Sequence, residues 1–270
     1  MTNLIRLSQA HLNLLEMCPP KFRQVYLDGL SSIPHPEQQE SLAWGSRFHQ
    51  LMQQRELGLP IESLLAADRE LESSITALLK AAPDVLSNNN DNWREAEHCR
   101  TYGMGDFLLT VIYDLLIAGT ETAKIFDWKT YRKAQSKYKL ENNWQTRLYL
   151  YILAETSPYS PEQISMTYWF VKSANPQSLT FTYSDAQHAK TKKDLTNLLN
   201  NLERWLAAEP LQNATFPHRP NCESNCPFYQ SFKAIALSHS RPIASNTQNS
   251  ADCPDPDWLT SIADIEEISI

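Results

Sequence analysis

The chain has 270 residues, 42% of them hydrophobic, with a formal net charge of −7. This length and apolar content are enough for one large domain or two small ones with a real core. The absence of any run of about 18 apolar residues excludes a membrane span. The N-terminus lacks the apolar segment of a secretory signal, so we expect a cytoplasmic protein.

The first third of the chain is predicted to be helical. Ser8 can cap a helix that runs toward Met17. Pro19 and Pro20 then interrupt the pattern, and apolar residues return at helical spacing up to Leu30. Two further helices are expected over residues 42–57 and 61–82, the second with a clear apolar stripe.

Strand character begins at Trp93, after an asparagine-rich loop. The remaining elements are predicted as strands over residues 93–102, 107–117 and 123–130, a helix over 142–154, strands over 164–171 and 178–183, and a helix over 185–208. Helices therefore precede a mixed sheet and return after it. This order predicts an α/β core with an N-terminal helical subdomain.

The strongest chemical signal is a pair of carboxylates on neighbouring predicted strands, Asp114 and Asp127. Because side chains alternate across a strand, Asp127 and Lys129 should point to the same face. Two converging carboxylates make a hard-oxygen site for Mg²⁺, and a lysine beside them can hold a water or a phosphate oxygen. These parts suit metal-assisted hydrolysis of a phosphodiester. Taken alone, Asp-x-Lys is also common as a surface ion pair.

Other polar residues accompany this pair in a defined order. His49 follows Gly45 by four residues in a helix-compatible region, and Gln145 and Tyr149 share one face of a predicted helix. Glu97 lies at the start of the strand region, with Glu95 as the alternative. In this order the set resembles the PD-(D/E)XK nuclease superfamily, and within it the RecB-like exonuclease branch. The resemblance covers roughly residues 5–232.

The resemblance implies a restriction-endonuclease-like core, in which a mixed central sheet is flanked by helices. It also implies roles for individual residues. Mg²⁺ or Mn²⁺ would be held by His49, Asp114, Asp127 and the backbone carbonyl of Trp128. Lys129 would orient or help deprotonate the attacking water, Gln145 and Tyr149 would position the phosphate backbone or the water, and Glu97 would support the metal site. An imidazole ligand favours some preference for Mn²⁺.

Charge is distributed unevenly along the chain. Arg132, Lys133 and Lys137 lie in a basic stretch directly after the predicted metal site. We expect them to contact DNA phosphates; a solvated loop and helix face is the alternative. Residues 238–270 carry one base against six acidic residues. We expect a nuclease domain over residues 1–237, with its helical subdomain at about 34–92, and a flexible acidic tail that could engage a protein partner.

Three cysteines, Cys18, Cys222 and Cys226, match places that hold an iron–sulfur cluster in some RecB-like nucleases. The fourth cysteine, expected near Phe232, is missing. Three interpretations remain open: a cluster with an unusual fourth ligand such as Cys253, a zinc site completed by His218, or a degenerate site held by packing. Disulfides are not expected in a cytoplasmic chain.

The sequence therefore predicts a metal-dependent DNA nuclease. The resemblance implies an exonuclease of repair or recombination that acts on single-stranded DNA or DNA with free ends. Two alternatives belong to other classes. One is a non-catalytic nucleic-acid-binding scaffold that keeps the nuclease fold, against which the intact Asp114, Asp127 and Lys129 argue. The other is a hydrolase of small phosphate esters, against which the basic stretch argues.

Overall fold

The structure is a computed structural model that describes residues 4–31, 35–86, 92–131, 136–208, 216–220 and 228–229. The chain divides into two compact units, one formed by residues 1–10 and 34–200 and the other by residues 11–33 and 201–270. The first unit contains the whole sheet. The predicted acidic tail, Cys222 and Cys226 lie outside the described residues, and the predicted domain boundaries remain predictions.

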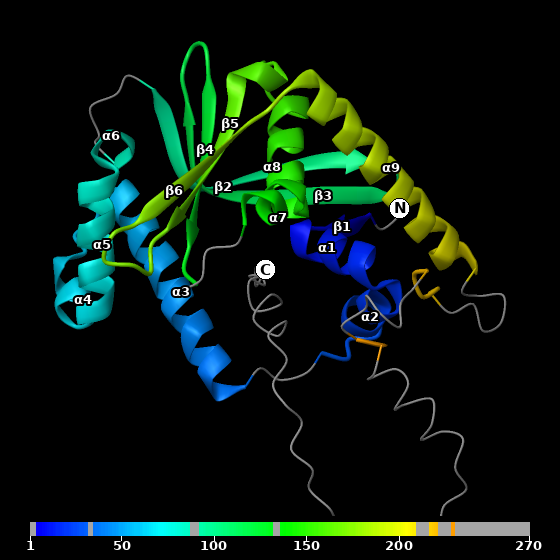
Figure 1. Ribbon diagram of the computed structural model, residues 1–270, viewed down its shortest axis with the longest axis horizontal. Helices are drawn as coiled ribbons and strands as arrows, with labels where there is room; N and C mark the ends of the chain where they lie inside the picture. Colours follow the sequence, from blue (N-terminus) through cyan, green and yellow to red (C-terminus); the bar gives the residue numbers. More distant parts are fainter. Residues whose placement is uncertain are drawn as a thin grey trace, which may run out of the picture. The chain divides into compact units, whose positions relative to one another are not determined.

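Apart from a short first strand, the elements follow the predicted order of helices, then strands, then helices (Figure 1). The described helices are α1 (Gln9–Met17), α2 (Pro19–Phe22), a π-helical turn (Arg23–Leu27), α3 (Pro36–Glu56), α4 (Glu62–Ala66), α5 (Arg69–Ala81), α6 (Pro83–Leu86), α7 (Lys137–Asn142), α8 (Trp144–Glu155), a 3-10 turn (Pro161–Gln163) and α9 (Asp185–Ala208). The described strands are β1 (Ile5–Leu7), β2 (Trp93–Met104), β3 (Phe107–Ala118), β4 (Ala123–Lys129), β5 (Ile164–Phe170) and β6 (Gln177–Thr182).

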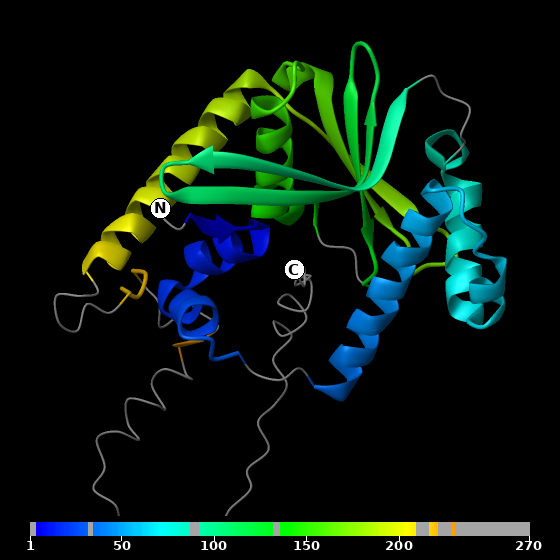
Figure 2. The same cartoon turned by 180° about the vertical axis from the view of Figure 1, so that it is seen from behind.

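These strands form one mixed sheet in the order β1-β3-β4-β5-β6, with β2 paired to β3. The β1–β3 and β4–β5 pairs are parallel, and the other pairs are antiparallel. Figure 2 shows the long hairpin that β2 and β3 form. A mixed sheet flanked by helices, with helices before it in the chain, confirms the predicted α/β fold class.

The path of β3 creates a fork in the sheet. One edge of β3 pairs with β2 along its length except at Asp114, opposite Glu97. The other edge pairs first with β1, as far as Leu109, and then with β4, from Leu115 onward. The β3–β4 register ends at the pair Leu115↔Phe126, although β4 continues to Lys129 beside β5. Residues 110–114 of β3 and 127–129 of β4 therefore line the two arms of a fork.

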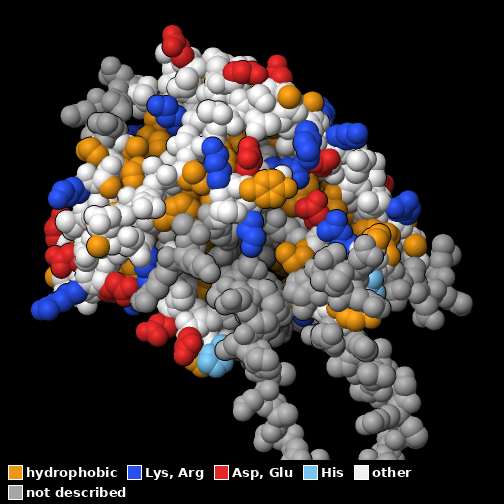
Figure 3. All heavy atoms as spheres, in the orientation of Figure 1, with side chains coloured by type: hydrophobic (Ala, Val, Ile, Leu, Met, Phe, Trp, Pro, Cys, Tyr) orange, Lys and Arg blue, Asp and Glu red, His pale blue; other side chains and the backbone are white. Residues whose placement is uncertain are grey.

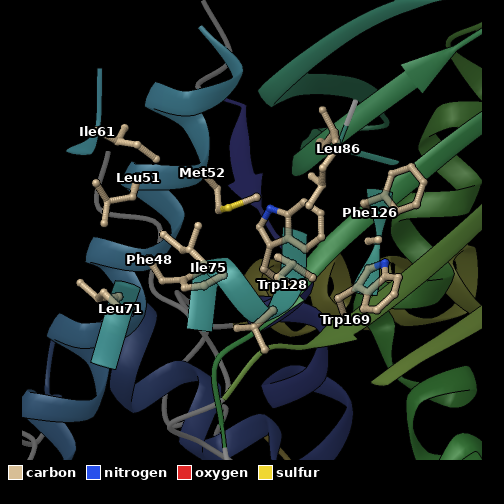
Figure 4. Packing of buried hydrophobic residues seen from close by; sticks show 14 of the residues in the cluster. Phe48, Leu51, Met52, Ile61, Leu71, Ile75, Leu86, Phe126, Trp128 and Trp169 are labelled. Carbon is tan, nitrogen blue, oxygen red and sulfur yellow. The ribbon is translucent and has the colours of Figure 1, made fainter. Parts of the chain in front are cut away.

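Alternation along β4 directs its side chains to two different layers. Phe126 and Trp128 enter an apolar cluster with residues of α3 and α5. Figure 4 shows Phe48, Met52 and Ile75 around Trp128 in this cluster. The intervening Asp127 instead forms a hydrogen bond with a side chain of α8. The sheet thus presents apolar residues to α3 and α5, and polar residues of β4 to α8.

Helix caps explain where the observed helices depart from the predicted ones. The single helix predicted over residues 61–82 is divided, because the Asp68 side chain accepts hydrogen bonds from the backbone N–H groups of Glu70 and Leu71 and begins α5. Likewise, Asn143 caps α8 by accepting from the Gln145 N–H at 2.8 Å. α3 begins six residues before the predicted start, since Pro36 fits the first turn of a helix.

The second unit is held by an aromatic cluster. His11 of α1 lies against Tyr26, with ring centroids 4.0 Å apart, and Phe22 stacks on Phe216. Phe216 also contacts Trp205, so residues before α3 pack against the chain that follows α9. Cys18 is buried in this unit. Among the described helices, none has the length and apolar character needed to cross a membrane.

Burial of His11 predicts a pH dependence of stability. Desolvation lowers the pKa of His11 from 6.5 to about 4. Between these values the unfolded chain binds a proton that the folded chain does not, so the free energy of unfolding falls as pH drops from 6.5 toward 4. The loss from this residue should be of order 3 kcal/mol. Urea unfolding of the wild type and His11→Phe across this window measures it, and parallel pH profiles would contradict the prediction.

Candidate active site

Polar side chains meet at the fork between β3 and β4. Asp114, only 8% exposed, bridges the two arms, because its Oδ2 accepts a hydrogen bond of 2.6 Å from the backbone N–H of Trp128. This contact takes the place of the ladder, which ends one residue away on β3, at Leu115, and two residues away on β4, at Phe126. The carboxylate therefore has one oxygen fixed by the backbone of β4, and the other, Oδ1, faces α3.

Three possible metal ligands converge from different elements: His49 of α3, Glu97 of β2 and Asp114 of β3. The Nδ1 atom of His49 lies 3.3 Å from Asp114 Oδ1 and 3.9 Å from Glu97 Oε1. Two ligands of one Mg²⁺ can be no further apart than twice the metal–ligand distance, about 4.2 Å. Both separations satisfy this limit, and an imidazole with two carboxylates suits Mn²⁺ or Mg²⁺. The residues therefore fit a divalent cation.

Glu97 reaches this cluster through an unusual backbone conformation. It lies opposite Asp114 in the hairpin, between the pairs Ala96↔Leu115 and His98↔Tyr113. Its φ is 53°, in the left-handed region that non-glycine residues rarely adopt. Such strain costs about 1–2 kcal/mol and often occurs at functional sites. The alternative Glu95 instead forms a hydrogen bond with His98 at 2.7 Å.

A second polar group lies on the α8 side of β4. The Lys129 ammonium lies 2.8 Å from Asp127 Oδ1 and donates to Gln145 Oε1 at 2.7 Å. Gln145 Nε2 in turn donates to Asp127 Oδ2 at 2.6 Å. Two hydrogen bonds and one ion pair thus link the three side chains in a ring, and Asp127 is only 3% exposed. The predicted placement of Asp127 and Lys129 on one face agrees with this geometry.

Two tyrosines, Tyr149 and Tyr168, lie close to the Asp127–Lys129–Gln145 group. The Lys129 ammonium lies 5.0 Å from the ring centroid of Tyr168, which stands opposite Asp127 on β5. Burial, with the negative charges of Asp127 and Asp114 adding to it, raises the pKa of Tyr149 well above its usual value. Burial likewise raises the pKa of Tyr168. Both phenols therefore stay neutral and can donate a hydrogen bond.

A glycine fixes the distance between α3 and the end of β4. A Cβ atom at Gly45 would lie 2.9 Å from the Thr130 side-chain Oγ1, closer than a real contact allows. His49 follows Gly45 by four residues and so lies on the same face of α3. The close approach at Gly45 therefore helps to set the position of the His49 imidazole at the fork.

We expect Gly45→Ala to lower the DNA cleavage that the sequence predicts by up to about 10²-fold, since a misplacement of about 1 Å in a reacting group can cost this much. Alanine also favours the helix by about 1 kcal/mol, so a loss of activity would not come from a weaker helix. Cleavage rates of Gly45→Ala, Thr130→Ala and the double variant make a complete cycle. The double variant should recover activity, because the Thr130 Oγ1 is absent. Wild-type activity in Gly45→Ala would contradict this role.

The structure brings together seven of the sequence-predicted residues: His49, Glu97, Asp114, Asp127, Lys129, Gln145 and Tyr149. Trp128 contributes its backbone N–H to Asp114, while its side chain lies in the apolar cluster. Lys137 begins α7, with its ammonium 6.0 Å from the ring centroid of Phe181. Arg132 and Lys133 lie outside the described residues.

Two contacts at the fork escaped prediction. The position of Tyr168 beneath Lys129 depends on the parallel β4–β5 register, Asp127↔Tyr168, which no local pattern encodes. The Trp128 N–H that fixes Asp114 is a backbone group without a sequence signal. The aromatic run Tyr168-Trp169-Phe170 predicts a strand but does not indicate which strand pairs with it.

Comparisons with known proteins agree with this fold. A family model described as the PD-(D/E)XK nuclease superfamily matches residues 6–231. The crystal structure of a candidate exonuclease from Eubacterium rectale is 13% identical, covers 91% of this chain and 92% of that chain, and has a TM-score of 0.51, a likeness of fold alone. The crystal structure of SSO0001 is 14% identical over 78% and 87% of the two chains, but its TM-score of 0.33 is too low to bear on the fold. No curated protein matches the chain.

Proposed function

The chain belongs to the PD-(D/E)XK nuclease superfamily, and on that premise we propose that it is a metal-dependent DNA exonuclease of the RecB-like branch. The observation that carries the proposal is the convergence of side chains at the fork. A group of three ligand residues lies on one side and the Asp127–Lys129–Gln145 ring on the other. A phosphodiester placed between them would meet the parts that metal-assisted hydrolysis needs.

A divalent cation is proposed at His49, Glu97 and Asp114, with Asp127 and the Trp128 carbonyl as further ligands. When bound, Mg²⁺ or Mn²⁺ would polarise the phosphoryl group and lower the pKa of a bound water. The His49 imidazole favours Mn²⁺ over Mg²⁺. The resemblance implies a supporting role for Glu97 beside the metal. We propose that Glu97 binds the cation directly, since its Oε1 lies close enough to His49 to share one.

Lys129 is proposed to orient the attacking water and to stabilise the negative charge that develops on the phosphate. Its ammonium is held in place by Asp127 and Gln145, so little reorganisation is needed when a substrate arrives. Gln145 fixes the rotamers of both partners from the first turn of α8. Tyr149, neutral because its pKa is raised, can donate a hydrogen bond to a phosphate oxygen.

The proposed substrate is DNA, single-stranded or with free ends, in repair or recombination. Arg132, Lys133 and Lys137 are proposed to contact its phosphates. On the face shown in Figure 3, Lys and Arg side chains lie among hydrophobic and acidic ones instead of forming one continuous basic surface. Phosphate contacts on this face would therefore come from separate positions, each contributing to a salt-dependent affinity.

Two further parts of the proposal concern residues outside the described part of the chain. An iron–sulfur cluster would join the buried Cys18 to Cys222 and Cys226, with a zinc site or a degenerate site as alternatives. Iron, zinc and sulfide content after anaerobic purification decides among these. The acidic segment 238–270 is proposed to bind a protein partner.

The proposed function is tested with matched linear and circular DNA, each single- and double-stranded and uniformly labelled. Purified full-length protein is incubated with Mg²⁺, with Mn²⁺ and with EDTA. We expect linear molecules with free ends to be degraded to short products, circles to persist, and EDTA to stop the reaction. Cleavage of circles at the same rate would replace the exonuclease by an endonuclease of the same family.

A further inference from the structure

A pocket outside the fork lies between α5 and the loop that joins β5 to β6. Figures 1 and 2 both show this loop beside α5. Its volume is about 350 Å³, within the range of small-molecule sites, about 300–1,000 Å³. Most of the residues that line it are small or carry one polar group: Glu70, Ser73, Ser74, Lys172, Ser173 and Ala174. Four of these six residues bear a hydroxyl group or a cationic amine, which are hydrogen-bond donors.

Lys172 is the cation of this pocket, and its side chain is only 14% exposed. The ammonium lies 4.3 Å from the ring centroid of Trp44, in cation–π contact with a buried indole. Trp44 is itself stacked on Phe48 and belongs to the apolar cluster. An apolar ring thus positions the ammonium without using its N–H donors.

The ion pair of Lys172 is loose by comparison with others in this chain. Its ammonium lies 3.9 Å from Glu70 Oε1, beyond hydrogen-bond distance, and the Glu70 side chain is about half exposed. The corresponding distances are 2.8 Å for Lys129–Asp127 and 2.6 Å for Lys190–Asp194. A largely buried ammonium with no closer anion than this among the described residues favours the binding of one from outside.

The loop that carries Lys172 is well defined. The Ser173 hydroxyl donates to the Asn175 carbonyl at 3.2 Å and accepts from the Asn175 N–H at the same distance. Ser173 is therefore engaged in shaping the loop. Ser73 and Ser74 of α5 supply hydroxyl groups from the opposite wall. The pocket combines one held cation with hydroxyl donors, which is the chemistry that recognises a phosphate group.

The pocket adjoins the fork. The N–H of Val171 donates to the carbonyl of Lys129 at 3.0 Å, and Lys172 is the next residue. From the register Lys129↔Phe170 and ordinary strand spacings, the Cα atoms of Lys129 and Lys172 lie roughly 8 Å apart. The two ammonium groups face different layers, Lys129 toward Gln145 of α8 and Lys172 toward Trp44 of α3, so a bound strand would pass the end of β4 to reach both.

We propose that this pocket binds a phosphate group of the nucleic-acid strand whose scissile bond lies in the fork, with Lys172 as its principal ligand. The proposal rests on the nuclease function proposed above and adds a second contact point on the substrate. Glu70 has the opposite effect to Lys172, because its carboxylate competes with the phosphate for the ammonium. The phosphate can be an internal phosphodiester or a terminal phosphomonoester, which share this chemistry.

Binding is measured without cleavage, by fluorescence anisotropy of labelled single-stranded oligonucleotides with the full chain in EDTA. We expect Lys172→Met to weaken affinity about tenfold, as for one charge-assisted hydrogen bond, and to reduce the slope of log affinity against log salt by about 0.7. Lys124→Met is the matched control, because Lys124 is an exposed lysine of β4. Equal affinities for the two variants would overturn the proposal.

Glu70→Gln gives a change of opposite sign. Removing the competing carboxylate should strengthen binding about two- to fivefold. This gain should vanish when Lys172→Met is also present, since Glu70 then has no ammonium to occupy. A gain that persists in the double variant would mean that Glu70 acts by general repulsion of DNA, and it would overturn the assignment of the pocket.

The source of the phosphate is identified with oligonucleotides that end in 5′-phosphate, 3′-phosphate or hydroxyl groups. A terminal phosphate predicts tighter binding of one phosphorylated end by the wild type and not by Lys172→Met. An internal phosphate predicts an equal loss with all three. Because these measurements need no catalysis, absence of cleavage by the wild type would refute the proposed nuclease activity and leave the binding result to decide the pocket by itself.

Discussion

Asp114→Asn should reduce metal-dependent DNA cleavage by about 10³-fold or more, since a catalytic cation contributes several kcal/mol of transition-state stabilisation. The substitution removes the negative charge that would help to hold a cation with His49 and Glu97. It keeps an oxygen that can accept the Trp128 N–H, so the fork should keep its geometry. Initial rates of DNA cleavage at saturating Mn²⁺ measure the effect.

The control for this variant is Asp106→Asn, which removes the same charge from the exposed turn between β2 and β3. It should cleave DNA at the wild-type rate. The melting temperatures of both variants should stay within a few degrees of the wild type. An Asp114→Asn protein that is folded and cleaves at the Asp106→Asn rate would remove Asp114 from the site.

Lys129→Met should lower the cleavage rate by about 10²–10⁴-fold, the range for loss of a positioned acid–base group. The same change leaves Asp127 buried without its ammonium partner, which should cost about 3–5 kcal/mol of stability in EDTA. Cleavage rates and urea unfolding of one preparation measure the two effects. Lys124→Met, on the same strand but exposed, should change neither.

The double variant Asp127→Asn/Lys129→Met separates catalysis from stability. Removing both charges of the pair should restore much of the free energy of unfolding, because no charge is left buried and unpaired. Activity should remain lost. If activity returned together with stability, Lys129 would have a structural role only.

Part of the side-chain arrangement at the fork was predictable because it depends on short spacings. Asp127 and Lys129 share a face by strand alternation, and Gln145 and Tyr149 share a face by helical periodicity. Most strand boundaries also followed from alternation and glycine turns, and the observed strands differ from the predicted ones by at most two residues. The short β1, Ile5–Leu7, was not predicted, because three residues are too few to give a pattern.

What escaped prediction depends on contacts between distant segments. The fork exists because β1 and β4 divide one edge of β3, and no local pattern encodes that division. The left-handed backbone of Glu97 depends on the hairpin around it. The division of the predicted helix at Asp68 had a local signal, since aspartate is a strong helix cap. The continuous apolar stripe from residue 61 to 82 nevertheless favoured one helix.

If the fork hydrolyses DNA with a divalent cation, the cleavage rate must follow the concentration of that cation. The decisive experiment is the cleavage rate of wild-type protein on linear DNA as Mn²⁺ is titrated after exhaustive chelation, with Asp114→Asn in parallel. We predict no cleavage in EDTA, a saturable rise with Mn²⁺ for the wild type, and a rate at least about 10³-fold lower for the variant at every concentration. Cleavage that persists in EDTA, or a wild type inactive at every Mn²⁺ concentration, would contradict it.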